Sequence, residues 1–143
     1  MKPALFVLAV AFVLSACGGS DAPDSSDAPS PAAPAVELPI ETIELGPIDA
    51  ALATEGQGIY ETRCTTCHKM EGRYVGPPLG DVAGQRKPEY IMNMILAPEK
   101  MLQADATAQA LLAEYSVPMT NQNLSEEEAR AILEYLRQVH EGA

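Results

Sequence analysis

Cysteine, histidine and aromatic residues are all scarce in this chain of 143 residues. It has three cysteines, two histidines, two phenylalanines and no tryptophan. A structural zinc site needs about four cysteine or histidine ligands, and Cys17 and His140 stand far from the other candidates, at no finger-like spacing. Each cysteine lies in one of the motifs described below, so none is left for a disulfide framework.

Basic residues are scarce too, with nine lysines and arginines against 20 acidic residues and a formal net charge of −11. A nucleic-acid-binding domain needs clustered basic residues to neutralise phosphates, so we expect no nucleic-acid partner. The length suits one small domain with appended segments.

The chain also lacks an apolar run long enough to cross a bilayer, which takes about 20 residues. The first apolar run, residues 4–14, follows Lys2 and leads into Ser15, Ala16 and Cys17, which is typical of a secretory signal. The ending resembles the lipobox of bacterial lipoproteins. That resemblance implies removal of residues 1–16, lipidation of Cys17 and anchoring on the periplasmic side of a membrane. The alternative is an ordinary signal peptide in which Cys17 has no role.

Residues 17–47 contain no lysine or arginine and are rich in proline, alanine, serine and aspartate. Such a composition buries too little apolar surface to offset the entropy of ordering. We therefore predict a disordered tether over 17–47 and a folded domain over 48–143. About 95 residues make a small apolar core, so a buried cofactor would supply much of the missing apolar area.

The most specific motif is Cys64-Thr65-Thr66-Cys67-His68, which has the form C-x-x-C-H. This is the attachment signature of c-type haem, in which each cysteine forms a thioether bond and the histidine can reach the iron. A thioredoxin-type redox pair would need a βαβ context, and no strand alternation surrounds the motif. The motif therefore indicates one covalent haem c, with His68 as an iron ligand.

This stretch resembles the monohaem class I cytochromes c, here in a bacterial lipoprotein form. Gly56 and Tyr60 precede Cys64 by eight and four residues, and in that family such residues let the first helix cross the last one closely. The resemblance covers residues 52–139 and implies a small all-α domain wrapped around one haem.

A second part of the resemblance lies in the segment 76–80, Gly-Pro-Pro-Leu-Gly. It is similar to the Gly-Pro-x-Leu stretch of the family. The similarity implies that the carbonyl of Pro77 accepts a hydrogen bond from Nδ1–H of His68, and that Leu79 packs on the haem. A rigid turn with no further role is the alternative.

The second axial ligand of the iron has to come from outside the motif, and methionine sulfur and histidine nitrogen are the natural candidates. Met119 follows Pro118 in a loop ahead of the last helical segment, which is where the family carries its methionine ligand. Met101 lies in a helical pattern, where methionine more often fills a core, and His140 lies at a helix end. We predict Met119 as the ligand, with Met101 next.

The hydrophobic pattern predicts helices and no strands. The predicted helices cover residues 52–63, 87–97, 99–115 as one helix or two, and 126–140. Within 87–97, Pro88 suits the first helical turn, and we expect one apolar stripe to face the core, made up of Tyr90, Ile91, Met94 and Ile95. Ser125 and Glu128 form a capping box at the start of the last helix.

The first functional hypothesis is a monomeric one-electron carrier that is not an enzyme. It would run between a quinol-oxidising donor complex and a periplasmic reductase, nitrous-oxide reductase among the candidates, or a terminal oxidase. The alternatives are a haem enzyme or small-ligand sensor with an open sixth iron position, and a lipoprotein without haem. Residues 50–87 alone have a basic excess, so we expect a neutral to basic docking face that includes Arg63, Lys69 and Arg73.

Overall fold

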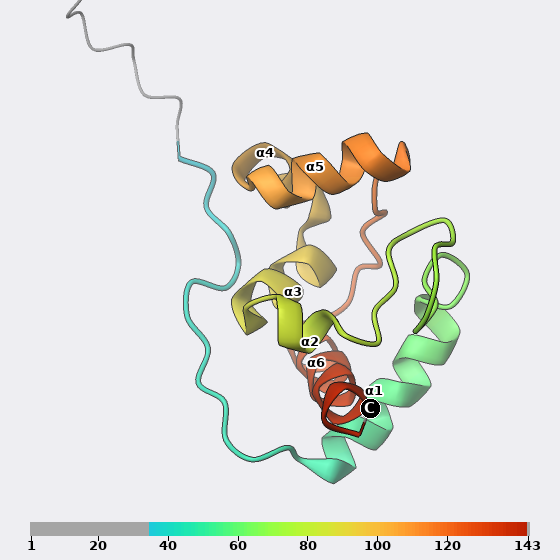
Figure 1. The fold of residues 1–143 in the computed structure, drawn as a ribbon. Coiled ribbons are helices and arrows are strands. Elements are labelled where there is room, and N and C mark those ends of the chain that lie inside the picture. Colours follow the sequence, from blue (N-terminus) through green and yellow to red (C-terminus); the bar gives the residue numbers. More distant parts are fainter. Residues whose placement is uncertain (1–34, 143) are drawn as a thin grey trace, which may run out of the picture. The chain divides into compact units, whose positions relative to one another are not determined.

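The computed structural model describes residues 35–142, and these belong to one compact unit of the chain. The described part holds six α-helices and no strand (Figure 1). They are α1 (Ala50–Arg63), α2 (Val82–Gln85), α3 (Pro88–Leu96), α4 (Pro98–Ala104), α5 (Ala106–Tyr115) and α6 (Glu126–Glu141). None of these helices is long and apolar enough to span a membrane. The predicted signal and Cys17 lie outside the described residues.

Polar side chains fix where the helices begin. The Asp49 carboxylate accepts hydrogen bonds from the first amides of α1, and Ser125 and Glu128 form the predicted capping box of α6. Asp105 ends α4 and caps α5, because its side chain accepts from the amide of Ala108 at 2.9 Å. The segment 99–115 is therefore divided between two helices.

The close crossing of α1 and α6 is the most extensive helix–helix contact of the fold. A Cβ atom at Gly56 would overlap the carbonyl of Ala131 and lie 2.8 Å from the amide nitrogen of Ile132. One turn further along α1, the ring of Tyr60 packs on that of Tyr135 with centroids 5.4 Å apart. The glycine and the aromatic residue therefore occupy the crossing as the family resemblance implied.

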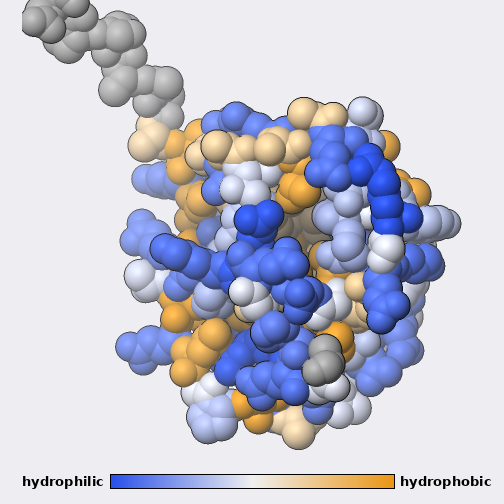
Figure 2. Space-filling view, in the orientation of Figure 1, coloured by the Kyte–Doolittle hydropathy of each residue, from blue (hydrophilic) through white to orange (hydrophobic). Residues whose placement is uncertain are grey.

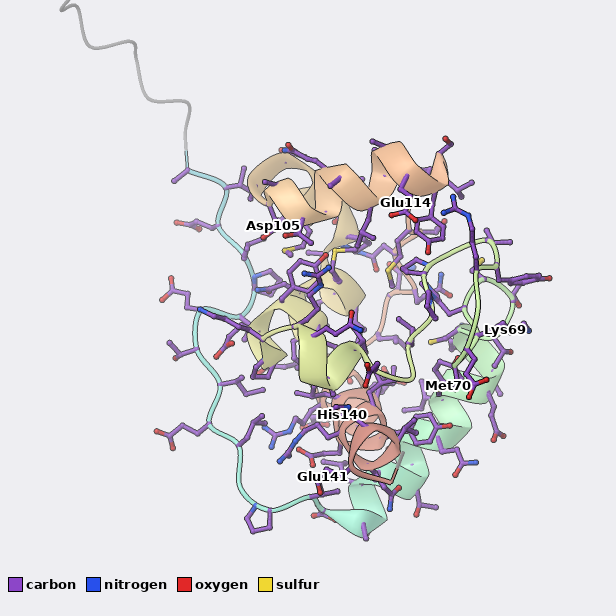
Figure 3. The ribbon with its side chains drawn as sticks, in the orientation of Figure 1. Lys69, Met70, Asp105, Glu114, His140 and Glu141 are labelled. Carbon is purple, nitrogen blue, oxygen red and sulfur yellow. The ribbon has the colours of Figure 1, made fainter. Side chains whose placement is uncertain are left out.

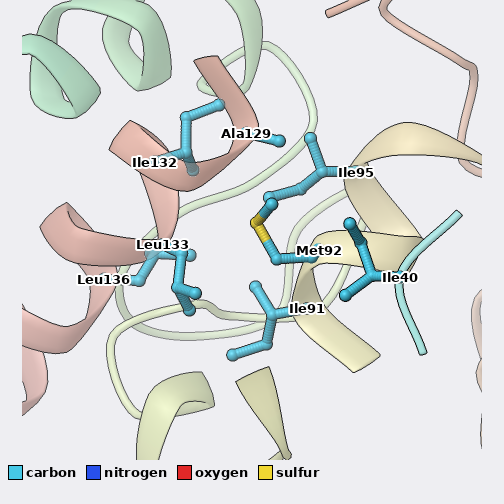
Figure 4. Packing of buried hydrophobic residues seen from close by; sticks show 8 residues of the cluster. All are labelled: Ile40, Ile91, Met92, Ile95, Ala129, Ile132, Leu133 and Leu136. Atoms are coloured by element: carbon cyan, nitrogen blue, oxygen red, sulfur yellow. The ribbon is translucent and has the colours of Figure 1, made fainter. Parts of the chain in front are cut away.

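The apolar core lies between α3 and α6 (Figure 4). Ile91, Met92 and Ile95 of α3 face the apolar stripe of α6. Ala129, Ile132, Leu133 and Leu136 make up that stripe. The spacing of each set puts its residues on one side of their helix. One face of α3 therefore packs on α6, and its other faces are left for other contacts.

Residues 35–47, which we call the strap, run along α3 toward the start of α1 (Figure 1). Ile40 is buried, and both its backbone groups bond to the buried side chain of Asn93: the amide donates at 2.9 Å and the carbonyl accepts at 2.8 Å. The amide of Ile43 donates to Glu89 at 3.2 Å. The prediction of disorder up to residue 47 is wrong for the strap, because Asn93 satisfies its backbone and Ile40 joins the core.

The end of the strap is fastened to α6 by a buried charge. Glu134, 1% exposed, accepts hydrogen bonds from Arg137 at 2.8 Å and from Arg130 at 3.0 Å. The same two guanidinium groups donate to the carbonyls of Gly46 and Glu44. A buried carboxylate needs such partners, and here the same two arginines also supply hydrogen bonds to backbone carbonyls of the strap.

Candidate haem site

The attachment motif follows directly on the end of α1. The amides of Cys67 and His68 both donate to the carbonyl of Cys64, at 3.0 and 2.8 Å, so the motif is a tight turn. The turn keeps the two thiols near each other, with Cys64 partly buried and Cys67 exposed. Burial, followed by the proximity of Cys67, raises the pKa of the free Cys64 thiol to about 11.

The ring of His68 is held from two sides. Its Nδ1 lies 2.9 Å from the carbonyl oxygen of Pro77, and because a carbonyl can only accept, Nδ1 carries the proton. A Cβ atom at Gly76 would lie 2.6 Å from Cε1 of the same ring, so this loop packs directly on the imidazole. The hydrogen bond expected from the sequence is present, and it leaves Nε2 free for a metal.

Two adjoining cavities, of about 160 and 470 Å³, open beside the motif. Both are lined by Cys64, His68, Pro77, Met94, Leu111, Tyr115 and Met119. Their walls come mainly from the turn after α1, from α3, from α5 and from the loop before α6. Figure 2 shows apolar atoms around a hollow below α4 and α5.

Met119 lies in the loop between α5 and α6 and lines both cavities together with His68. Asn121 fastens this loop, since its side chain donates to the carbonyl of Leu96 at 3.0 Å and accepts from the amide of Asn123 at 2.8 Å. The left-handed backbone of Ser116, with φ 60°, ends α5 and starts the turn into the loop. The loop that carries Met119 is therefore anchored on the end of α3.

The other methionines in the domain divide into core residues and cavity residues. Met92 and Met101 are 1% and 2% exposed and line neither cavity. Met94, which the sequence pattern assigned to the core, lines both cavities. Met94 therefore replaces Met101 as the alternative sulfur ligand to Met119.

The remaining predicted site residues also have definite positions. Leu79 lines the larger cavity, where the resemblance placed it against the haem. His140 lines neither cavity: its Nδ1 lies 2.9 Å from Asp81 Oδ1, near the end of α6 (Figure 3). Tyr90 and Arg86 also line the larger cavity. Sequence reasoning missed this role because it read Tyr90 as part of an apolar stripe.

The residues around the cavities suit a haem bound through thioether bonds. Both cysteines line the smaller cavity, and so does His68, whose Nδ1–H is oriented by Pro77. Sulfur and imidazole ligands suit haem iron, and the mostly apolar lining of both cavities suits a porphyrin. The donor set and the lining of the site therefore fit the same group.

The comparisons with known proteins point the same way. The family model for cytochrome c matches residues 53–140. Cytochrome c from Rhodothermus marinus is 49% identical, with a TM-score of 0.72 over 73% of this chain and 91% of that chain. An engineered form of it, bound to a carbene intermediate, is also 49% identical, with a TM-score of 0.67 over 72% of this chain and 90% of that one.

A cytochrome c domain from Pseudomonas putida is 30% identical, with a TM-score of 0.53 over 58% of this chain and 85% of that chain. No protein with a curated description gives a significant match. The family match spans more than half of the chain and includes the attachment motif, α3, the Met119 loop and most of α6. The chain belongs to the cytochrome c family, whose members carry a covalent haem c with its iron and are typically electron carriers.

Proposed function

We propose that this protein is a lipid-anchored periplasmic carrier of single electrons, in which His68 and Met119 are the two axial ligands of the haem iron. The observation that carries the proposal is the presence of both side chains on one pair of adjoining cavities beside the attachment cysteines. With both axial positions taken, no position is left for a substrate. The haem would supply the Fe(III)/Fe(II) couple.

The chain's own residues support such a role through rigidity. Pro77 and Gly76 hold the imidazole of His68, and Asn121 fixes the loop that carries Met119. Apolar walls from α3 and α5 keep water from the site, and burial together with sulfur ligation favours the ferrous form. A site whose ligands barely move between redox states has a low reorganisation cost, which is what a carrier requires.

The alternative, a haem enzyme or small-ligand sensor with an open sixth position, has less support. Such a site needs a distal acid or base, and histidine is the residue that most often serves. Within residues 35–142, His68 is the only histidine that lines either cavity, because His140 is bonded to Asp81.

The partner would dock on the rim of the smaller cavity. Val75 and Val117 line that cavity and are 39% and 52% exposed, and Tyr74 beside them is 51% exposed. Arg63 lines the same cavity. This apolar rim suits a redox protein, with a quinol-oxidising complex as donor and a periplasmic reductase or terminal oxidase as acceptor.

The charge around the rim is lower than the sequence suggested. Arg73 Nη1 lies 2.7 Å from Glu114 Oε1, and its guanidinium also stacks on the ring of Tyr115 at 4.1 Å. Lys69 lies over the ring of Tyr74 at 4.8 Å. We therefore assign the docking charge to Arg63 and Lys69, with Arg73 neutralised by Glu114.

Anchoring through Cys17 completes the proposal. It is supported by the secretory signal and the lipobox-like residues 14–17, which lie outside the described part of the chain. A periplasmic position also agrees with haem attachment of this kind, which occurs outside the bacterial cytoplasm.

The ligand assignment is tested with Met119→Ala in the full-length holoprotein, and with Met94→Leu as the matched control. Met119→Ala should remove the sulfur-to-iron charge-transfer band of the oxidised protein, lower the reduction potential and let imidazole bind the iron. Met94→Leu should leave all three unchanged. The reverse result, with the band lost in Met94→Leu and kept in Met119→Ala, would transfer the ligand role to Met94.

A further inference from the structure

The hydroxyl of Tyr90 is the one buried side-chain polar atom in residues 35–142 that has no hydrogen-bond partner. Tyr90 belongs to α3 and lines the larger cavity. Buried polar groups in native proteins are almost always hydrogen-bonded, so an exception needs an explanation. The missing partner therefore has to be sought among groups that occupy this cavity.

Arg86 stands beside Tyr90. Its guanidinium carbon lies 5.6 Å from the centre of the Tyr90 ring, and among residues 35–142 it is the only lysine or arginine that lines the larger cavity. Arg86 takes part in none of the ion pairs formed by the described residues. The half-buried guanidinium of Arg86 supplies a positive charge, and the phenol of Tyr90 beside it supplies a hydrogen-bond donor. A carboxylate can pair with the charge and accept the hydrogen bond at the same time.

The other charged residues that line the larger cavity are acidic. Glu71 and Asp81 line the larger cavity, and Asp81 is engaged with His140. Burial, followed by the negative charge of Asp105, raises the pKa of Tyr90, while Arg86 acts in the opposite direction. The phenol therefore stays protonated and able to donate. Without Arg86, the acidic residues would repel any carboxylate that entered.

Haem carries two propionate carboxylates, on the side of the ring opposite its two vinyl groups. The vinyl groups must reach Cys64 and Cys67, and Cys67 lines only the smaller cavity, whereas Tyr90 and Arg86 line only the larger one. Arg63, the other basic residue on the cavities, adjoins Cys64 at the thioether end. The propionates have to lie away from that end.

We propose that the Tyr90 hydroxyl and the Arg86 guanidinium bind one haem propionate, the phenol by donating a hydrogen bond and the guanidinium by pairing with its charge. This assignment rests on the covalent haem alone and holds whether Met119 or Met94 is the sulfur ligand. Pairing with Arg86 offsets the negative charge of the propionate, which otherwise stabilises Fe(III). The pair therefore raises the reduction potential and keeps the propionate ionised to low pH.

Two substitutions in the full-length holoprotein test the proposal, each with a matched control. Tyr90→Phe removes only the hydroxyl, and Tyr74→Phe makes the same change at an exposed position. Arg86→Gln removes the guanidinium, and Lys87→Gln removes an adjacent exposed charge that lines neither cavity. Each variant is titrated for its reduction potential against pH and unfolded in denaturant.

Both test variants should lower the reduction potential relative to their controls. They should also move the pH-dependent step of the potential to higher pH, because the propionate loses a partner that stabilises its ionised form. Tyr90→Phe should also raise the unfolding equilibrium constant by about tenfold or more, because a hydrogen bond to a charged group is lost. If the hydroxyl has no partner in the holoprotein, Tyr90→Phe will instead be neutral or stabilising. That result, or an Arg86→Gln variant that titrates like Lys87→Gln, would overturn the proposal.

Discussion

Gly56→Ala provides the sharpest test of the packing that holds the attachment motif in place. The added Cβ would overlap the Ala131 carbonyl and lie 2.8 Å from the amide nitrogen of Ile132. Both atoms belong to the backbone of α6, so no side chain can rotate away. The two helices would have to separate by on the order of 1 Å, which also loosens the fully buried Ala53 and the pair Tyr60 and Tyr135.

The size of the effect follows from two opposing terms. Overpacking of a rigid core costs about 1–3 kcal/mol and sometimes more, and a contact with backbone on both sides lies at the upper end of that range. Replacing a helical glycine by alanine gains up to about 1 kcal/mol of helix propensity. We therefore expect Gly56→Ala to lower the free energy of unfolding by about 2 kcal/mol.

Gly58→Ala in the same helix is the control. Gly58 is exposed, and a Cβ there would meet nothing within 4 Å, so this variant should keep the propensity gain of up to about 1 kcal/mol. Both holoproteins are unfolded in guanidinium chloride and followed by far-ultraviolet circular dichroism. If Gly56→Ala is as stable as Gly58→Ala, then the helices do not cross as closely as described.

Three further predictions concern the strap, the anchor and the docking face. Asn93→Ala should lower the free energy of unfolding by about 2 kcal/mol, because both buried hydrogen bonds to Ile40 are lost. The amide of Ile40 should then exchange its hydrogen faster, and an unchanged exchange rate would contradict the prediction. Cys17→Ala should release the protein from membranes without altering its absorption spectrum, and persistent membrane association in high salt would indicate another anchor. Electron transfer to the physiological partner should slow with rising salt concentration and with Arg63→Glu or Lys69→Glu. Rates that neither charge reversal changes would place the docking face elsewhere.

The parts of the fold that sequence reasoning predicted are those coded by local signals. Pro88 and the Ser125 capping box each act within one helical turn, so their effect can be read from neighbouring residues. Asp105 acts as locally, but the pattern of 99–115 left one helix or two open. The attachment motif is equally local. The bond from His68 to Pro77 spans nine residues and was reached through the family resemblance, because spacing alone allowed a plain turn.

The parts that were missed depend on contacts between distant segments. Ile40 and Asn93 lie 53 residues apart. The average composition of residues 17–47 predicted disorder and gave no sign that Ile40 packs in the core. In the sequence, Glu134 looks like a residue of the polar face of its helix. In the structure it is buried and paired with Arg130 and Arg137. Tyr90 and Met94 were assigned to the core because an apolar stripe that faces a cofactor looks the same in sequence as one that faces other side chains.

In the proposed lipid-anchored form, the strap also limits how far the domain can lie from Cys17. Because residues 35–47 are held on the domain, 18 residues (17–34) would separate the anchor from it, and these could extend at most about 60 Å. Without the strap, 31 residues (17–47) would separate them and could extend at most about 105 Å, so the strap makes the largest volume open to the domain about fivefold smaller. The strap also lies beside α4, where Lys100 donates to the carbonyl of Glu37 at 3.0 Å. With 13 residues held in this way, a carrier anchored at Cys17 would reach only partners within a short distance of its membrane.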